Sequence, residues 1–98
     1  MTAYFDAAAV AWDTKQQRVE QAKAIAEIIE LTIPLSIDTN ALEFGCGTGL
    51  LGFNLIDKVG ELTFSDTSRG MLSEVANKIR YHSHKAAKIL DLKLSNYF

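Results

Sequence analysis

Two carboxylates and three glycines stand where they could recognise a bound ligand. Gly45, Gly47 and Gly49 fall within five positions of the segment ALEFGCGTGLLGF, directly after a short apolar stretch. Glycine gives up the most backbone freedom on folding, so this cluster predicts a ligand that lies almost against the backbone. Glu43 precedes the loop, and Asp66 ends the next apolar stretch, ELTFSD. These five residues are the first candidate binding residues.

The spacing of the glycines excludes one phosphate loop and disfavours another. A P-loop requires lysine and then Ser or Thr after its last glycine, but Leu50 and Leu51 follow here. In the dinucleotide pattern G-x-G-x-x-G, Leu50 would occupy the place of the third glycine. The pattern present is E-x-G-x-G-x-G.

The two acids point to a cationic nucleoside. The Glu43 carboxylate is a poor neighbour for a pyrophosphate, but it suits an ammonium or a sulfonium. Asp66 can accept two charge-assisted hydrogen bonds from a ribose diol. A nucleoside with a cationic amino-acid tail satisfies both acids, and S-adenosylmethionine is such a molecule.

The elements that must hold these residues alternate between helix and strand. The order is helix 14–31, strand 41–44, helix 48–58, strand 61–66, a helix capped by Ser68, and strand 86–90. We expect Asp13 or Thr14 to cap the first helix, and Phe44 to lie in the core with Leu50 and Leu51. This order predicts an α/β fold with a Rossmann-like parallel sheet of about three strands and flanking helices.

The predicted sheet gathers the candidate residues at one edge. Ligands of such sheets bind outside the carboxyl ends of the strands. Gly45, Asp66 and Asp91 each follow or end one of the three strands. Their shared position at the carboxyl ends of the strands is the main evidence in the sequence for a binding site.

Composition narrows the class of protein. Ninety-eight residues, 48% of them hydrophobic, suffice for one small domain. The net charge of −2 argues against a nucleic-acid partner, and no apolar run has the length of a membrane span. The lone Cys46 fits a reducing compartment, so we expect cytoplasmic residence. His82 and His84 have no further ligand at metal-site spacing, so no metal is expected.

Three segments together resemble a known family. ALEFGCGTGLLGF and LTFSDTSRGML closely resemble class I S-adenosylmethionine-dependent methyltransferases with the Rossmann-like fold. YFDAAAVAWD is similar to the segment that precedes this domain in the small-molecule methyltransferases of the group. The likeness runs from Tyr4 to about Leu92, and it implies S-adenosylmethionine as cofactor and a small-molecule methyl acceptor.

The resemblance assigns roles to the glycine loop and its acids. Glu43 would fix the loop and the methionine end of the cofactor. The backbone at Gly45 and Gly47 would face the amino-acid and ribose parts, within a loop that also includes Cys46 and Gly49. No thiol chemistry is expected of Cys46, which suits this loop by its small size.

Further residues would surround the nucleoside. Asp66 would hold the ribose hydroxyls, with Thr67 and Met71 beside the adenine. Asp91 would accept a hydrogen bond from the adenine amino group, and Leu92 would flank the ring. Two aromatic residues, Tyr4 and Trp12, would close over the cofactor.

The family pattern continues beyond Phe98 with further strands, which carry most acceptor-binding and catalytic residues. The resemblance thus implies that 1–98 is a truncated single domain, and no catalytic residue is assigned. Strand 41–44 would be left as an exposed edge, which invites pairing. We therefore expect a homodimer, or completion by another chain. The alternatives are a non-catalytic module that dimerises or binds a partner and, less favoured, a nicotinamide-dinucleotide-binding fragment.

Overall fold

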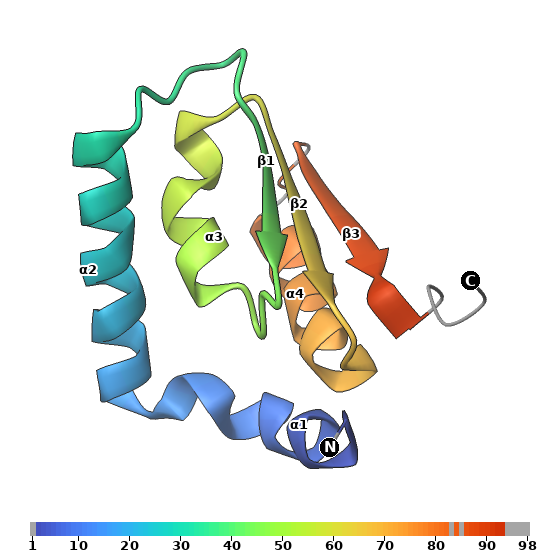
Figure 1. Cartoon of the computed structure of the whole chain (residues 1–98). Coiled ribbons are helices and arrows are strands. Elements are labelled where there is room, and N and C mark those ends of the chain that lie inside the picture. Colours follow the sequence, from blue (N-terminus) through green and yellow to red (C-terminus); the bar gives the residue numbers. More distant parts are fainter. Residues whose placement is uncertain (1, 83, 85, 94–98) are drawn as a thin grey trace.

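The computed structural model describes residues 2–82, 84 and 86–93. A helical N-terminal segment comes first, with α1 (Thr2–Ala8) and the 3-10 helix η1 (Ala9–Thr14). The remaining elements alternate as the sequence predicts (Figure 1). They are α2 (Gln16–Thr32), β1 (Asn40–Phe44), α3 (Leu50–Leu55), the 3-10 helix η2 (Ile56–Lys58), β2 (Glu61–Asp66), α4 (Arg69–His82) and β3 (Ala87–Asp91).

The three strands form one parallel sheet in the order β1-β2-β3. Glu43 lies beside Phe64, which lies beside Ile89, and Asp66 lies beside Asp91. All three strands run the same way, so their carboxyl ends meet at one edge. The predicted α/β fold is confirmed.

The core lies on one face of the sheet. Leu62 and Phe64 of β2 point into it and pack with Leu72 and Val75 of α4. Helices α3 and α4 cover this face, and α2 packs against α3. Phe64 and Val75 are completely buried. This packing fixes the end of β2, and with it Asp66.

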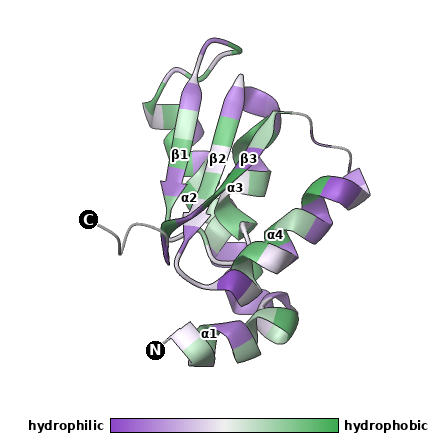
Figure 2. Ribbon diagram, turned by 90° about the vertical axis from the view of Figure 1, so that its right-hand side faces the viewer, coloured by the Kyte–Doolittle hydropathy of each residue, from purple (hydrophilic) through white to green (hydrophobic). Residues whose placement is uncertain are grey.

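The opposite face of the sheet is open in the described part of the chain. Figure 2 views the strands in front of α2 and α3. The side chains of Leu42, Phe44 and Leu90 are 60%, 78% and 46% exposed. Our prediction of Phe44 as a core residue is therefore wrong. Side chains alternate along a strand, so Phe44 points away from the helices that cover Glu43.

Two predicted helix starts have different outcomes. Ser68 caps α4 as expected, since its hydroxyl accepts a hydrogen bond of 3.1 Å from the Met71 N–H. Neither Asp13 nor Thr14 caps α2, whose cap is Lys15 without a side-chain hydrogen bond. The Asp13 carboxylate instead contacts Thr48 and Lys78. The Asp13 carboxylate, predicted to cap α2, thus makes tertiary contacts in place of the cap.

Within the described ranges, none of the helices combines the length and apolar character that crossing a bilayer requires.

Candidate cofactor site

The glycine loop divides into two positions open to a ligand and one that serves packing. All three glycines have positive φ, at +71° for Gly45, +58° for Gly47 and +84° for Gly49. A Cβ on Gly49 would stand 2.7 Å from the Phe53 ring. A Cβ on Gly45 would meet nothing within 4 Å, and one on Gly47 only the Met71 sulfur at 4.0 Å. Gly45 and Gly47 thus leave backbone free for a ligand.

Asp66 ties the end of β2 to this loop. Its Oδ2 accepts a hydrogen bond of 2.8 Å from the Gly47 N–H, and its Oδ1 accepts one of 2.9 Å from the Ser68 N–H. The Cys46 N–H also donates to the Ser65 carbonyl oxygen, at 2.8 Å. These bonds orient the Asp66 carboxylate and hold the loop against β2.

Most of the predicted nucleoside-binding residues line one cavity. Its volume is about 230 Å³, and it lies between the loop, the end of β2 and the N-terminal segment. It is lined by Phe5, Trp12, Gly45, Gly47, Asp66, Thr67 and Met71. All of these except Phe5 are predicted binding residues. The structure brings them together from the N-terminal segment, the glycine loop, the end of β2 and the start of α4.

Two aspartates fasten the N-terminal segment across the carboxyl ends of the strands (Figure 1). Asp6 Oδ1 accepts hydrogen bonds from the Ser68 hydroxyl at 2.6 Å and from the Gly70 N–H at 2.8 Å. These bonds favour the charged carboxylate, so the pKa of Asp6 is lowered.

The second aspartate, Asp13, joins the same segment to the loop and to α4. Its Oδ1 accepts a hydrogen bond of 2.5 Å from the Thr48 hydroxyl. Its Oδ2 lies 2.7 Å from Lys78 Nζ, which also donates to the Thr48 carbonyl oxygen at 2.8 Å. The N-terminal segment is thus held by Asp6 in α1 and by Asp13 near the end of η1, as a cover over the cavity.

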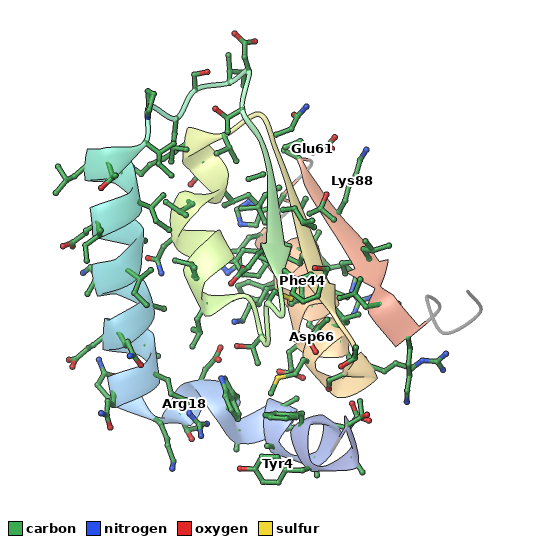
Figure 3. The ribbon with its side chains drawn as sticks, in the orientation of Figure 1. Tyr4, Arg18, Phe44, Glu61, Asp66 and Lys88 are labelled. Atoms are coloured by element: carbon green, nitrogen blue, oxygen red, sulfur yellow. The ribbon has the colours of Figure 1, made fainter. Side chains whose placement is uncertain are left out.

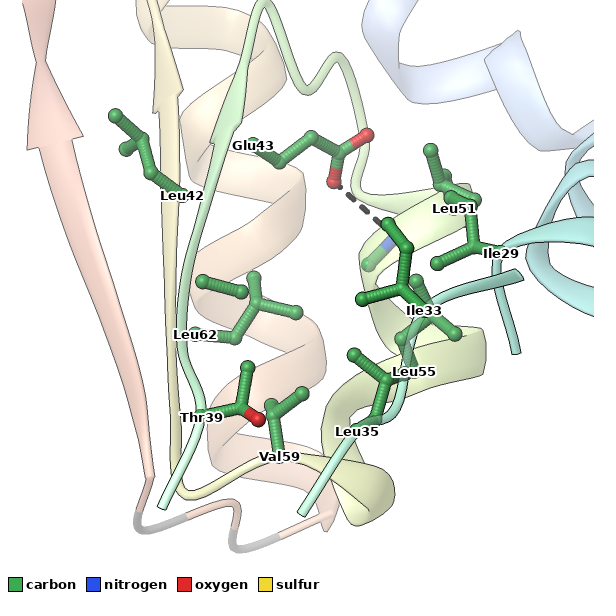
Figure 4. A pocket seen from close by; sticks show the side chains of 12 residues that line it. Ile29, Ile33, Leu35, Thr39, Leu42, Glu43, Leu51, Leu55, Val59 and Leu62 are labelled. Atoms are coloured by element: carbon green, nitrogen blue, oxygen red, sulfur yellow. Dashed lines mark hydrogen bonds between the residues drawn. The ribbon is translucent and has the colours of Figure 1, made fainter. Parts of the chain in front are cut away.

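Glu43 lies behind the loop, where it meets α3. Its Oε1 accepts a hydrogen bond of 3.1 Å from the Gly52 N–H (Figure 4). The pKa of Glu43 is raised to about 7, mainly by burial; the nearby Asp66 charge adds to this rise, and the hydrogen bond from Gly52 opposes it. Cys46 is buried within the loop, and burial is the main cause that raises its pKa to about 12. A neutral thiol results.

Glu43 and Cys46 line a second cavity of about 360 Å³. This cavity shares Trp12 and Gly45 with the first one, so the two adjoin at the loop.

Four predicted residues lie outside both cavities: Gly49, which packs against Phe53, and Tyr4, Asp91 and Leu92. Tyr4 is 63% exposed and contacts Phe5, whose ring takes the covering position beside Trp12. Figure 3 shows Tyr4 on the outer side of α1. Asp91 stands beside Asp66 in the sheet, but its carboxylate pairs with Arg69 at 3.4 Å. Leu92 lines neither cavity.

Sequence reasoning missed Phe5, Asp6 and Asp13 as residues of the site, and also Arg18, which lines the second cavity. A signal was present, because Phe5-Asp6 and Trp12-Asp13 repeat the pattern aromatic-aspartate at a distance of seven residues. Residues seven apart lie on one face of a helix. This pattern indicates a helical segment that turns its aromatic and acidic side chains toward the same neighbour.

Among the described residues, no three His, Cys, Asp or Glu side chains gather as metal ligands would.

Comparison with known proteins identifies the fold. No family model matches the sequence, and no curated protein matches it. Among solved structures, DhpI in complex with SAH has a TM-score of 0.68 and 22% identity, over 92% of this chain and 42% of that one. A S-adenosylmethionine-dependent methyltransferase from Clostridium acetobutylicum has a TM-score of 0.58 and 30% identity, over 72% and 28%. A dimethyladenosine transferase from Plasmodium falciparum has a TM-score of 0.63 and 25% identity, over 69% and 25%.

The chain spans less than half the length of each of these solved proteins. Its fold is similar to that of solved S-adenosylmethionine-dependent methyltransferases, as the sequence resemblance predicts.

Proposed function

We propose that the chain is the cofactor-binding part of a S-adenosylmethionine-dependent methyltransferase that acts on a small molecule. The observation that carries this proposal is the cavity that joins Gly45, Gly47, Asp66 and Met71 beneath Trp12. With the adjoining cavity behind the loop, its size falls in the range typical of small-molecule sites, roughly 300–1,000 Å³. The similarity to DhpI, which was solved in complexes with SAH and with SAM, supports the cofactor.

The residues of the cavity suit the parts of this cofactor. The Asp66 carboxylate would accept hydrogen bonds from the ribose hydroxyls, since each of its oxygens retains acceptor capacity beyond its single N–H partner. Met71 and Thr67 supply a wall for the adenine. The backbone at Gly45 and Gly47 would let the nucleoside approach closely. Glu43 would favour the cationic end.

A bound S-adenosylmethionine would supply an electrophilic methyl carbon on its sulfonium, from which the neutral thioether leaves when an acceptor, held close and in line, attacks that carbon. The contribution of this chain is to bind the nucleoside, to orient it against the loop and to cover it with the N-terminal segment. We assign no general base to the described residues and expect the acceptor site to come from further polypeptide.

The edge of β1 that pairs with no described strand is a candidate surface for a partner that completes the sheet. An apolar groove of about 330 Å³ runs beside β1, between α2 and α3, and Glu43 stands at its end (Figure 4). The exposed Leu42 and Phe44 continue this apolar surface on the open face of the sheet. We infer that a second copy, or another chain, covers β1. A non-catalytic module that dimerises through this surface is the alternative function.

A nucleic-acid acceptor is disfavoured only by the net charge of −2. The comparisons lend this expectation no support, because the solved relatives include the 23S rRNA methyltransferase ErmE, at a TM-score of 0.57 and 25% identity.

Calorimetric titration of the purified chain with S-adenosylmethionine, S-adenosylhomocysteine and NAD tests the proposal. We expect saturable binding of the first two and none of NAD at the same concentration. Binding of NAD alone would overturn the proposed cofactor, and binding of none of the three would favour the non-catalytic module.

A further inference from the structure

The apolar groove beside β1 and the cavity behind the glycine loop share a wall. The groove has a volume of about 330 Å³ and the cavity one of about 360 Å³, and both are lined by Glu43 and Leu51. Figure 4 shows the Glu43 side chain at one end of the groove, extending from β1 toward α3. The Glu43 carboxylate therefore borders two spaces, one at the edge of the sheet and one that adjoins the cavity of Asp66.

Helix α2 adds exposed apolar side chains to the rim of this groove. Ile29 and Ile33 of the helical end line the groove, while the neighbouring Ile28 and Leu31 are 62% and 88% exposed. Figure 1 shows α2 at the outer edge of the molecule, where it packs against α3. Among the described strands, none pairs with the outer edge of β1. The groove, its exposed lining residue Leu42 and the outer side of α2 thus form one apolar surface, here called the edge surface.

The edge surface has the shape and the size for contact with a second copy of itself. It combines a hollow, the groove, with projecting side chains, Ile28 and Leu31, so two copies related by a twofold axis can each fill the hollow of the other. Its exposed side chains would bury on the order of 1,000 Å² over both copies, which reaches the lower limit for a specific interface. Pairing of two β1 strands alone would leave the groove unfilled, because β1 presents only Ala41 and Glu43 on the face that the helices cover.

We propose that a second copy covers the edge surface, and that this association and cofactor binding strengthen each other through Glu43. The inference rests on the proposed function, in which the cationic end of S-adenosylmethionine faces this carboxylate. A second copy would remove water from the groove side of Glu43, which disfavours its charged form. A cation bound on the cavity side would offset this penalty. Because linkage is reciprocal, the cofactor should tighten the dimer by the same factor by which the dimer tightens cofactor binding.

Sedimentation equilibrium at pH 8 measures the dissociation constant of the wild-type dimer, with and without saturating S-adenosylmethionine. This pH lies above the Glu43 pKa of about 7, so the free chain carries the charged carboxylate. We expect the cofactor to lower the constant by about fivefold or more, as couplings between sites typically do. An unchanged constant, or a chain that stays monomeric at every concentration, would overturn the inference; the proposed function would stand if calorimetry shows that the cofactor binds. If the cofactor does not bind, both fail.

Two variants separate the contact surface from the carboxylate. Glu43→Gln retains an oxygen for the Gly52 N–H but has no charge, so a saturating cofactor should change its dimer constant by less than about twofold. Ile28→Asp should weaken the dimer by about tenfold or more, because it buries a charge in the contact. Tyr81→Asp, at an exposed position on α4, is the matched control and should dimerise as the wild type does. A full cofactor response of Glu43→Gln, or an unweakened Ile28→Asp dimer, would contradict the inference.

Discussion

The Gly47 N–H donates a hydrogen bond of 2.8 Å to Asp66 Oδ2, across 19 residues of sequence. This bond joins the two features that the sequence singles out, the glycine loop after β1 and the acid that ends β2. It also leaves one side of Gly47 open, with only the Met71 sulfur at 4.0 Å from the position of a Cβ. The acid therefore shapes the loop and borders the cavity at the same time.

Valine at Gly47 and at Gly49 should have different effects. Each substitution places a β-branched residue at positive φ, which costs about 1–2 kcal/mol. Gly49→Val should destabilise the fold further, because its Cβ would overlap the Phe53 ring. Gly47→Val should retain more stability but lose S-adenosylhomocysteine binding. Urea denaturation and calorimetry measure the two quantities, and equal losses of stability would contradict this division of roles.

Glu43 should make the stability of the empty protein depend on pH. Its pKa is raised from 4.5 to about 7, mainly by burial, so the folded state holds an extra proton between these values. The free energy of unfolding should therefore fall as pH rises from about 4.5 to 7. Glu43→Gln removes this loss while keeping an oxygen for the Gly52 N–H.

Urea denaturation at pH 5 and pH 8 measures the effect of this variant. Relative to wild type, Glu43→Gln should gain on the order of 1 kcal/mol more at pH 8 than at pH 5, a value reduced for the partial exposure of the carboxylate. Glu27→Gln, at an exposed site on α2, should show no such difference. A pH-independent effect of Glu43→Gln would contradict the raised pKa.

The ion pair between Asp13 and Lys78 should contribute more to stability than an exposed pair. Their side chains are 36% and 26% exposed and 2.7 Å apart. A double-mutant cycle of Asp13→Asn and Lys78→Met should give a coupling of about 1 kcal/mol. Glu61 and Lys88, 3.1 Å apart and labelled in Figure 3, are the control, since Lys88 is 65% exposed.

The control pair should couple by less than about 0.5 kcal/mol. Asp13→Asn should also make the N-terminal segment more susceptible to proteolysis. Equal coupling of the two pairs, with unchanged proteolysis, would show that Asp13 does not fasten the segment.

The open side of the sheet should mediate association. Light scattering over a range of concentrations should show a dimer or larger assembly, because a free monomer leaves Leu42 and Phe44 exposed. Phe44→Asp should shift this equilibrium toward monomer. Tyr81→Asp, at an 85% exposed position on α4, should not. A wild-type chain that is monomeric at every concentration would contradict this prediction.

The parts of the fold that local pattern determines were predictable from the sequence. The range of β2 is identical to the prediction, because its apolar alternation and its closing Asp66 are local signals. The exposure of Phe44 was not predictable in this way, since it depends on which face of the sheet carries helices. Phe44 is an apolar residue whichever face it points to, so its type does not show whether it is buried.

The cover of the site depends on contacts between distant segments. Asp13 has the sequence context of a helix cap, yet its carboxylate binds Thr48 and Lys78, which lie 35 and 65 residues further along the chain. Phe5, and not the neighbouring Tyr4, lines the cavity because of the direction in which α1 turns its side chains. Neither the contacts of Asp13 nor the position of Phe5 can be predicted from residue type alone.

Titration of S-adenosylhomocysteine into the wild-type chain and into Asp66→Ala tests the central claim most directly. If Asp66 holds the ribose hydroxyls, the variant should bind about 10- to 100-fold more weakly, a loss of roughly 1.5–3 kcal/mol. Asp57→Ala, which removes an exposed carboxylate outside the cavity, should bind as the wild type does. Unchanged affinity of a folded Asp66→Ala protein would contradict the account and reduce Asp66 to a residue that only holds the loop.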